Sequence, residues 1–291
     1  MMLNTDSKIL IIGLGVMGGS YARALTKKGF AVRCITKNAE DITYAINAGM
    51  IKEGTTEVNA QWIRESNLIV FALYPKTFIS WIEEHGHLLK SGTTITDVSG
   101  VKSGVIAKIQ GSLPEGVEFI SAHPMAGRER SGVEFSDDSV FAGANYIVVP
   151  TEKNTEAAIL LCEELGRTLG FSRISRLSAE VHDRMIAFLS QLTHCIAVAL
   201  MNCNDAPDME KYTGDSFRDL TRIAKINENM WSELFLLNKD ALLAEMDAFA
   251  REFSNFRAML AAEDAEGMKE KMRASTAKRM KFDKPKGNAL S

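Results

Sequence analysis

Hydrophobic and polar positions change their spacing along the chain at about residue 175. Before that point, short apolar runs alternate with longer amphipathic segments, and such alternation predicts parallel strands joined by helices. The expected strands are Lys8 to Ile12, Ala31 to Ile35, Leu68 to Leu73, Thr93 to Thr96, Val117 to Ala122 and Asn145 to Val149. This part is therefore predicted to be an α/β domain with a doubly wound parallel sheet.

From about Ser178 the apolar positions recur at helical spacing, three or four residues apart, which predicts one buried stripe along a helix. The stripe consists of Met185, Leu189, Leu192, Ile196 and Leu200. Residues 230–281, rich in Leu, Met, Phe and Ala, continue as long helices. We therefore expect an α/β domain over residues 1–174, an all-α domain over 175–282 and a polar tail over 283–291.

Composition limits which classes of partner and which cellular compartment are expected for this chain. The chain has 291 residues and a formal net charge of −3, which argues against a nucleic-acid partner because phosphate binding needs a clustered basic surface. The N-terminus does not resemble a signal peptide, and the sequence has no run of about 18 apolar residues. Neither export nor membrane insertion is therefore expected. The four cysteines lack CxxC spacing and lie in apolar runs, so they are expected to be buried, reduced thiols in a cytoplasmic protein without a metal site.

A glycine-rich loop follows the first expected strand and opens the first expected helix. In that context a GxGxxG pattern predicts a Rossmann-type fold that binds a nicotinamide dinucleotide, NAD or NADP. The first glycine permits the tight turn, the second lets the backbone approach the pyrophosphate, and the third lets helix and strand pack closely. The expected cofactor-binding residues of the loop are Gly13, Leu14, Gly15, Val16, Met17 and Gly18.

The end of the second strand bears on the choice of cofactor. NAD-specific sites usually have Asp or Glu there, but this chain has Thr36, Lys37 and Asn38, which would tolerate or bind a 2'-phosphate. The residues therefore favour NADP. Leu73 and Asp97, at the ends of two further strands, are additional cofactor-binding candidates.

Polar residues at the carboxyl ends of parallel strands lie where open α/β sheets bind their ligands. Ser99 follows one such strand, and His123 follows another. Pro124 restricts His123 to extended backbone, which holds the imidazole at the edge of the sheet. A histidine there suits removal of a proton from a substrate hydroxyl while hydride leaves the same carbon.

Three segments together carry a family resemblance: the glycine-rich loop with Gly19-Ser20, the stretch His123-Pro124-Met125-Ala126-Gly127 with Ser131-Gly132, and Phe217-Arg218-Asp219-Leu220-Thr221-Arg222-Ile223-Ala224. In order and spacing, the chain resembles the prephenate and arogenate dehydrogenases of tyrosine biosynthesis over nearly its whole length. The resemblance implies a Rossmann domain, a helical dimerisation domain forming a homodimer, and an active site between the domains. It also implies oxidative decarboxylation of prephenate to 4-hydroxyphenylpyruvate, or of arogenate to tyrosine, with hydride transfer to NAD(P)+.

The same resemblance assigns roles to individual residues. His123 matches the catalytic histidine, Arg222 the arginine that binds the substrate's side-chain carboxylate, and His194 a second active-site histidine. Glu129 and Arg218 match charged residues near the site entrance.

Helical spacing supports part of this placement. Ser190 and Gln191 share a helix face with His194, roughly opposite the Met185 stripe. Arg218 and Arg222 stack at i and i+4, which fits an anionic substrate, although Asp215 or Asp219 could instead neutralise them.

Two positions depart from the family pattern. Gly100 stands where a serine is common, with Ser99 one residue earlier as a candidate substitute, and Gln191 stands where a second histidine is common. The chain shows no chorismate mutase segment, and any tyrosine inhibition is expected to act at the active site. Two other functions stay open: a β-hydroxyacid dehydrogenase, whose opening loop is similar but whose helix carries a lysine, and a non-catalytic nicotinamide-binding sensor.

Overall fold

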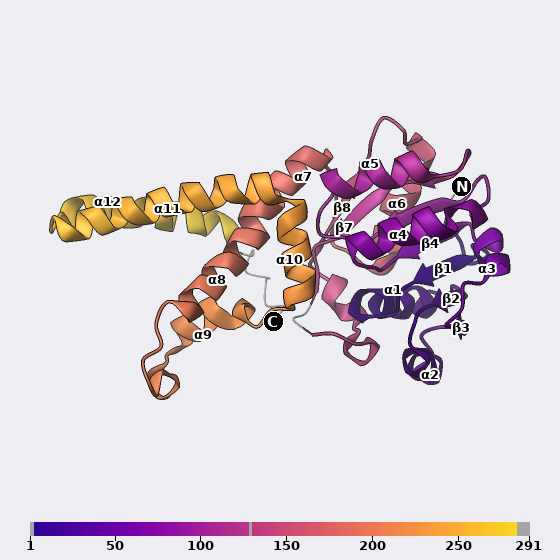
Figure 1. The fold of residues 1–291 in the computed structure, drawn as a ribbon, viewed down its shortest axis with the longest axis horizontal. Coiled ribbons are helices and arrows are strands. Elements are labelled where there is room, and N and C mark those ends of the chain that lie inside the picture. The colour runs from indigo at the N-terminus through magenta and orange to yellow at the C-terminus, as the bar shows by residue number, and fades with distance from the viewer. Residues whose placement is uncertain (1–2, 128–129, 284–291) are drawn as a thin grey trace, which may run out of the picture. The chain divides into compact units, whose positions relative to one another are not determined.

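The computed structural model describes residues 3–127 and 130–283. These residues fall into two compact units, one ending at Leu242 and the other beginning at Leu243. The first unit is built on a six-stranded parallel sheet with the strand order β3-β2-β1-β4-β5-β6 (Figure 1). Its strands are β1 (Ile9–Ile12), β2 (Val32–Ile35), β3 (Glu53–Thr55), β4 (Leu68–Phe71), β5 (Thr94–Asp97) and β6 (Glu118–Phe119).

Helices cover both faces of this sheet, as the doubly wound fold requires (Figure 1). Side chains of a strand alternate between faces, so Ile9 and Ile11 pack in one core and Leu10 and Ile12 in the other. The helices of this part are α1 (Val16–Lys27), α2 (Ala39–Asn47), α3 (Ala60–Glu65), α4 (Pro75–His85), α5 (Ser103–Ser112) and α6 (Glu156–Leu169). The predicted Rossmann-type architecture is confirmed.

A second, three-stranded sheet differs from the sequence prediction. The segment from Val117 to Ala122, expected as one strand, divides: β6 pairs with β5, and the chain then leaves to form β7 (Ser121–Pro124). Strand β7 runs antiparallel to β8 (Asn145–Val149), and β8 runs parallel to β9 (Arg173–Arg176), so the expectation of parallel strands throughout was wrong. The short strands β3 and β9 were missed because neither contains an apolar run.

The remaining chain is helical, and its first helix, α7, is capped by the Ser178 hydroxyl, which accepts from the backbone N–H of Val181. A π-helical turn, η4, joins α7 to α8 without a break. The elements are α7 (Ala179–Ile186), η4 (Ala187–Leu192), α8 (Thr193–Asn202), α9 (Asp215–Thr221), the 3-10 turn η6 (Arg222–Ala224), α10 (Glu228–Leu237), α11 (Lys239–Ala261) and α12 (Ala265–Arg279). Further 3-10 turns are η1 (Gly86–Leu88), η2 (Val133–Phe135), η3 (Asp138–Phe141), η5 (Met209–Tyr212) and η7 (Met280–Phe282). Of the predicted tail over 283–291, residues 284–291 lie outside the described residues.

The predicted buried stripe of the first long helix was only partly correct. Leu192 is buried, but Met185 and Leu189 are 41% and 45% exposed. A π-helical turn closes i to i+5 hydrogen bonds, so the face on which each residue lies shifts across it. Within the described residues, the continuous helix 179–202 is the one stretch long and apolar enough to cross a membrane, although polar residues such as Ser190 and His194 interrupt its apolar sequence.

The cysteines also differ in part from expectation. Cys34 and Cys162 are buried, Cys195 is half-buried, and Cys203 is exposed. Cys203 was misjudged because it directly follows the last residue of α8, where the helix ends and leaves its apolar surroundings.

Candidate active site

The glycine-rich loop lies between β1 and α1 and has the geometry that a dinucleotide needs. Gly13 has a φ of +96°, and a Cβ there would approach the Ala72 carbonyl oxygen to 2.5 Å and Leu73 Cδ2 to 2.8 Å. At Gly15 a Cβ would meet no atom within 4 Å, so the space above the loop is open. Helix α1 begins after Gly15 with no side-chain cap and no acidic residue in its first turn. Its free N–H groups therefore favour a phosphate, and the loop fits the predicted cofactor.

The end of β2 places Thr36, Lys37 and Asn38 beside the start of α2. Thr36 is buried and its N–H donates to the Thr55 carbonyl, whereas Lys37 and Asn38 are exposed. Asn38 Nδ2 donates to Asp41 Oδ2 at 3.0 Å. Asp41 is a carboxylate that the sequence reasoning had not weighed, because it comes three residues later in α2.

Asp97 and Lys102 form a buried ion pair below the carboxyl edge of the sheet, with Lys102 Nζ 3.0 Å from Asp97 Oδ2. The carboxylate also accepts from the Ser121 hydroxyl at 2.6 Å and from the backbone N–H of Ala122 at 3.0 Å. The Ser99 hydroxyl donates to the same carboxylate. Both Asp97 and Ser99 are thus committed to partners inside the protein, and neither their predicted cofactor nor catalytic role is visible in these contacts.

His123 lies in extended backbone within β7, as its position before Pro124 predicted. Its Nδ1 is 2.9 Å from Nε2 of His182, and Nδ1 of His182 is 2.7 Å from Oδ1 of Asp183. His182 and Asp183, both on α7, are buried. Sequence reasoning missed them because His182 is 59 residues from His123, and no spacing rule connects a strand end to that helix.

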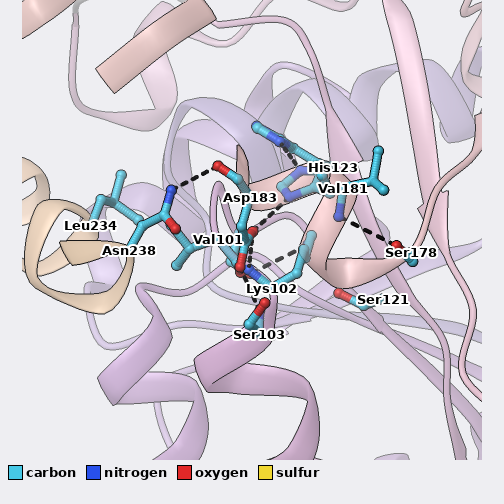
Figure 2. A network of polar contacts seen from close by, with 12 residues as sticks. Val101, Lys102, Ser103, Ser121, His123, Ser178, Val181, Asp183, Leu234 and Asn238 are labelled. Atoms are coloured by element: carbon cyan, nitrogen blue, oxygen red, sulfur yellow. Dashed lines mark hydrogen bonds and ion pairs between the residues drawn. The ribbon is translucent and has the colours of Figure 1, made fainter. Parts of the chain in front are cut away.

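Asp183 is itself held from two sides (Figure 2). Its carboxylate accepts from the backbone N–H groups of Lys102, at 2.9 Å, and Ser103, at 2.7 Å, and thereby caps α5. The Asn238 side chain donates to the Asp183 carbonyl at 2.9 Å. These bonds tie the first helix after the sheet, the start of α5 and the junction of α10 with α11 into one framework.

Burial and neighbouring charge set the protonation of this cluster. Burial, reinforced by His182 and Lys102, holds the pKa of His123 well below its usual value. Burial likewise lowers the pKa of His182. For Asp183, burial raises the pKa, but hydrogen bonds from His182 and Ser103 outweigh it and leave the pKa lowered. At neutral pH the cluster therefore holds two neutral imidazoles and one carboxylate.

Gly100 borders the free side of His123. A Cβ added at Gly100 would lie 3.8 Å from His123 Nε2 and 3.8 Å from Leu234 Cδ1 on α10. Position 100 therefore belongs to the site, but its glycine brings no hydroxyl. One turn before Leu234 on the same helix, Trp231 stacks on the predicted site residue His194, with ring centroids 3.8 Å apart.

Ser190 and Gln191, which were predicted to share a helix face with His194, both lie in the π-helical turn η4 and make different contacts. His194 Nδ1 lies 2.9 Å from the Ser190 carbonyl oxygen, so these two are neighbours. Gln191 instead is buried, donates to the Leu234 carbonyl and accepts from Asn238. Gln191 thus supports the framework around Asp183.

The two predicted arginines, Arg218 and Arg222, lie in different elements. Arg218 on α9 pairs with Asp215 at 2.8 Å and donates to the Thr213 carbonyl, which matches the alternative of surface neutralisation. Helix α9 ends at Thr221, and Arg222 begins the 3-10 turn η6. Glu129, predicted at the site entrance, lies outside the described residues.

Comparison with known proteins covers most of the chain. The family model described as "Prephenate dehydrogenase, nucleotide-binding domain" matches residues 21–170, and the one described as "Prephenate dehydrogenase, dimerization domain" matches residues 178–274. Prephenate dehydrogenase of Bacillus subtilis is 30% identical over 268 residues, which are 89% of this chain and 72% of that protein. Cyclohexadienyl dehydrogenase of Zymomonas mobilis is 29% identical over 283 residues, 94% of each chain.

Among solved structures, the chain is similar to prephenate dehydrogenase from Aquifex aeolicus in complex with hydroxyphenyl propionate and NAD+. The TM-score is 0.89 at 29% identity, and the match covers 96% of this chain and 99% of the other. The similarity spans both the sheet and the helices that follow it.

Proposed function

The chain belongs to the prephenate dehydrogenase family, and from that premise we propose that His123 is the base of its reaction. The protein is an NAD(P)-dependent oxidoreductase that acts on prephenate or arogenate. The observation that carries the proposal is the buried contact of His123 with His182, beside the open position at Gly100. It holds a neutral imidazole at the carboxyl edge of the sheet.

His123 moves one proton in each direction during turnover. It accepts the proton of the ring hydroxyl as the same carbon gives up a hydride, and it holds that proton while the carbon–carboxylate bond breaks and carbon dioxide leaves. The electron pair of that bond makes the ring aromatic, and His123 returns the proton to the phenolate oxygen. When bound, NAD(P)+ supplies the hydride acceptor. The lowered pKa of His123 keeps it able to accept a proton at pH 7.

Residues of the helical part complete the site in our proposal. Arg222 binds the side-chain carboxylate, for which a guanidinium offers a planar pair of donors. His194, fixed by Trp231 and the Ser190 carbonyl, contacts the substrate from the opposite side to the sheet. Ser99 and Gln191 act as positioning residues, since each is bonded within the protein. A tyrosine-like product would then compete with substrate for the same groups.

We propose that cofactor binding and substrate binding divide near residue 174, although β9 (Arg173–Arg176) runs through that point and the compact units of the structure divide after Leu242. In the proposal, residues 1–174 bind NAD(P), with NADP favoured by Lys37, and residues 175–282 bind substrate and form a cytoplasmic homodimer. The family model that matches residues 178–274 is described as a dimerization domain, which supports this part. Prephenate and arogenate differ in their side chain, which carries a keto group in one and an amino group in the other. Assays with both substrates determine which of them the enzyme prefers.

The test is His123→Asn, assayed with both substrates and both cofactors. Loss of general-base catalysis is expected to lower kcat by about 100-fold or more, because such catalysis contributes 10²–10⁴-fold. Binding of NAD(P)+, followed by fluorescence, should stay unchanged, since the loop at Gly13 is untouched. Turnover within about tenfold of the unaltered enzyme would sink the base role.

A further inference from the structure

His182 and Asp183 form a buried titratable pair to which the reaction as described assigns no task. Both lie at the start of α7, and their side chains are 0% and 6% exposed. The charged groups near His123 and this pair are Asp97, the last residue of β5, and Lys102, which follows the strand and donates to Asp97 and to the Ala122 carbonyl. No substrate group is needed to explain the contacts of His182, so its position calls for another account.

The hydrogen bonds of Asp183 determine where each proton of the cluster lies. A carboxylate can only accept, and Asp183 Oδ1 lies 2.7 Å from His182 Nδ1, so that nitrogen must carry a proton and donate it. Both carboxylate oxygens are held in this orientation, because the N–H of Lys102 donates to Oδ1 and the N–H of Ser103 donates to Oδ2. The tautomer of His182 is thus set by the capped end of α5.

His182 passes this constraint to His123. Burial and the nearby Lys102 ammonium disfavour a cationic His182. A neutral ring with its proton on Nδ1 has a lone pair on Nε2, and that lone pair faces Nδ1 of His123 at 2.9 Å. Nδ1 of His123 must then be the donor, which leaves a lone pair on its Nε2.

We propose that His182 and Asp183 are positioning residues that hold His123 in the Nδ1–H tautomer, so that its Nε2 faces the space beside Gly100 as the base. This inference rests on the proposed base role of His123. The geometry agrees, because Nε2 is the ring nitrogen that a Cβ at Gly100 would approach, at 3.8 Å. The reverse tautomer would present an N–H to the substrate hydroxyl and could not take its proton.

A direct test reads the tautomers in the unaltered protein. Long-range proton–nitrogen correlation spectra of the ¹⁵N-labelled chain report all five histidines, and the spectrum of His123→Asn assigns the signal of His123. We expect the Nδ1–H form for both His123 and His182 at pH 7.5. The Nε2–H form of His123, or a cationic His182, would overturn the proposal without touching the result of the His123→Asn assay.

Kinetics supply a second, independent readout. His182→Leu removes the acceptor for His123 Nδ1–H. We expect kcat to fall about tenfold or more and KM to change less than about twofold, because the substitution alters the tautomer of the base and leaves the substrate-binding groups in place. His182→Gln keeps an amide oxygen near the place of Nε2 and should recover much of kcat. The matched control is His87→Leu, since His87 is an exposed histidine on η1.

Removal of His182 should also move the pH profile. His182 is one of the causes that lower the pKa of His123, so the acid limb of kcat/KM should move to higher pH in His182→Leu. A purely structural role would lower the melting temperature but leave the acid limb in place. An unchanged limb with unchanged kcat in a folded His182→Leu protein would contradict the proposal.

Discussion

At the scale of single residues, two neighbouring positions near His123 differ in their hydroxyl groups: Gly100 has none, and the hydroxyl of Ser99 is bonded within the protein. Gly100 leaves open the place beside His123 where the family commonly has a serine, and a Cβ there would make only ordinary contacts at 3.8 Å. Ser99, the nearest serine in sequence, bonds to Asp97 and to the Val101 carbonyl. Its hydroxyl is therefore bonded within the loop.

The proposed preference for NADP also rests on single residues. Lys37 is exposed at the end of β2 and is expected to meet a 2'-phosphate, while Asp41 nearby carries the opposite charge. In Lys37→Ala, KM for NADP+ should rise about tenfold, which corresponds to one charge-assisted hydrogen bond of roughly 1.5 kcal/mol, while KM for NAD+ stays constant. Steady-state kinetics with both cofactors measures this.

Lys28→Ala provides the matched control, because Lys28 is an exposed lysine just after the far end of α1. It should leave both constants unchanged. A preference for NAD+ in the unaltered enzyme that persists in Lys37→Ala would exclude the proposed role.

At the scale of elements, interruptions in helices direct side chains. The π-helical turn η4 turns Gln191 toward Leu234 and Asn238 while Ser190 stays beside His194. Helix α9 likewise ends at Thr221, between the two arginines, and Arg222 begins the 3-10 turn η6. A π-helical turn inside a longer helix is often found at functional sites, and here it lies directly before His194.

Substitutions of Arg222 and Arg218 are expected to affect substrate binding differently. Arg222→Ala should raise the KM for prephenate or arogenate about tenfold or more, because a charge-assisted pair with the substrate carboxylate is lost. Arg218→Ala should change KM less than about twofold, since an exposed pair with Asp215 contributes little. An unaltered KM in Arg222→Ala, with either substrate, would contradict its assignment to the carboxylate.

At the scale of the whole molecule, the helical region leaves many large apolar side chains uncovered in the single chain. On α7, η4 and α8 these include Met185, Phe188, Leu189 and Met201, and on α11 they include Leu243, Met246, Phe249, Phe253 and Leu260. Large apolar side chains left uncovered in such number on these helices favour an interface. A second copy of the chain is the occupant we propose.

Sedimentation in detergent-free buffer tests this assembly. The unaltered chain should sediment as a dimer and remain in the soluble fraction, and Phe188→Glu should weaken the dimer, since burying one such ring contributes roughly 1.5–3 kcal/mol. Ile46→Glu, at a comparably exposed apolar position on α2, is the control and should leave the dimer intact. A monomer at micromolar concentration, or recovery of the chain with membranes, would count against the proposal.

Local rules explain what the sequence determined by itself. The loop from Gly13 to Gly18 was predictable because a strand, a turn that needs positive φ at Gly13 and a helix start are all encoded within a few residues. The extended backbone of His123 was predictable for the same reason, since Pro124 restricts its neighbour directly.

Contacts between distant segments were left to the tertiary structure. The pairing of His123 with His182 joins residues 59 apart, and the capping of α5 by Asp183 joins residues 80 apart, so no periodicity encodes either one. Packing also turned Ser99 inward, because the buried Asp97–Lys102 pair needs further hydrogen bonds around its carboxylate. The sequence thus determined where the cofactor loop and the histidine lie along the chain, and only the fold decided which partners control that histidine's proton.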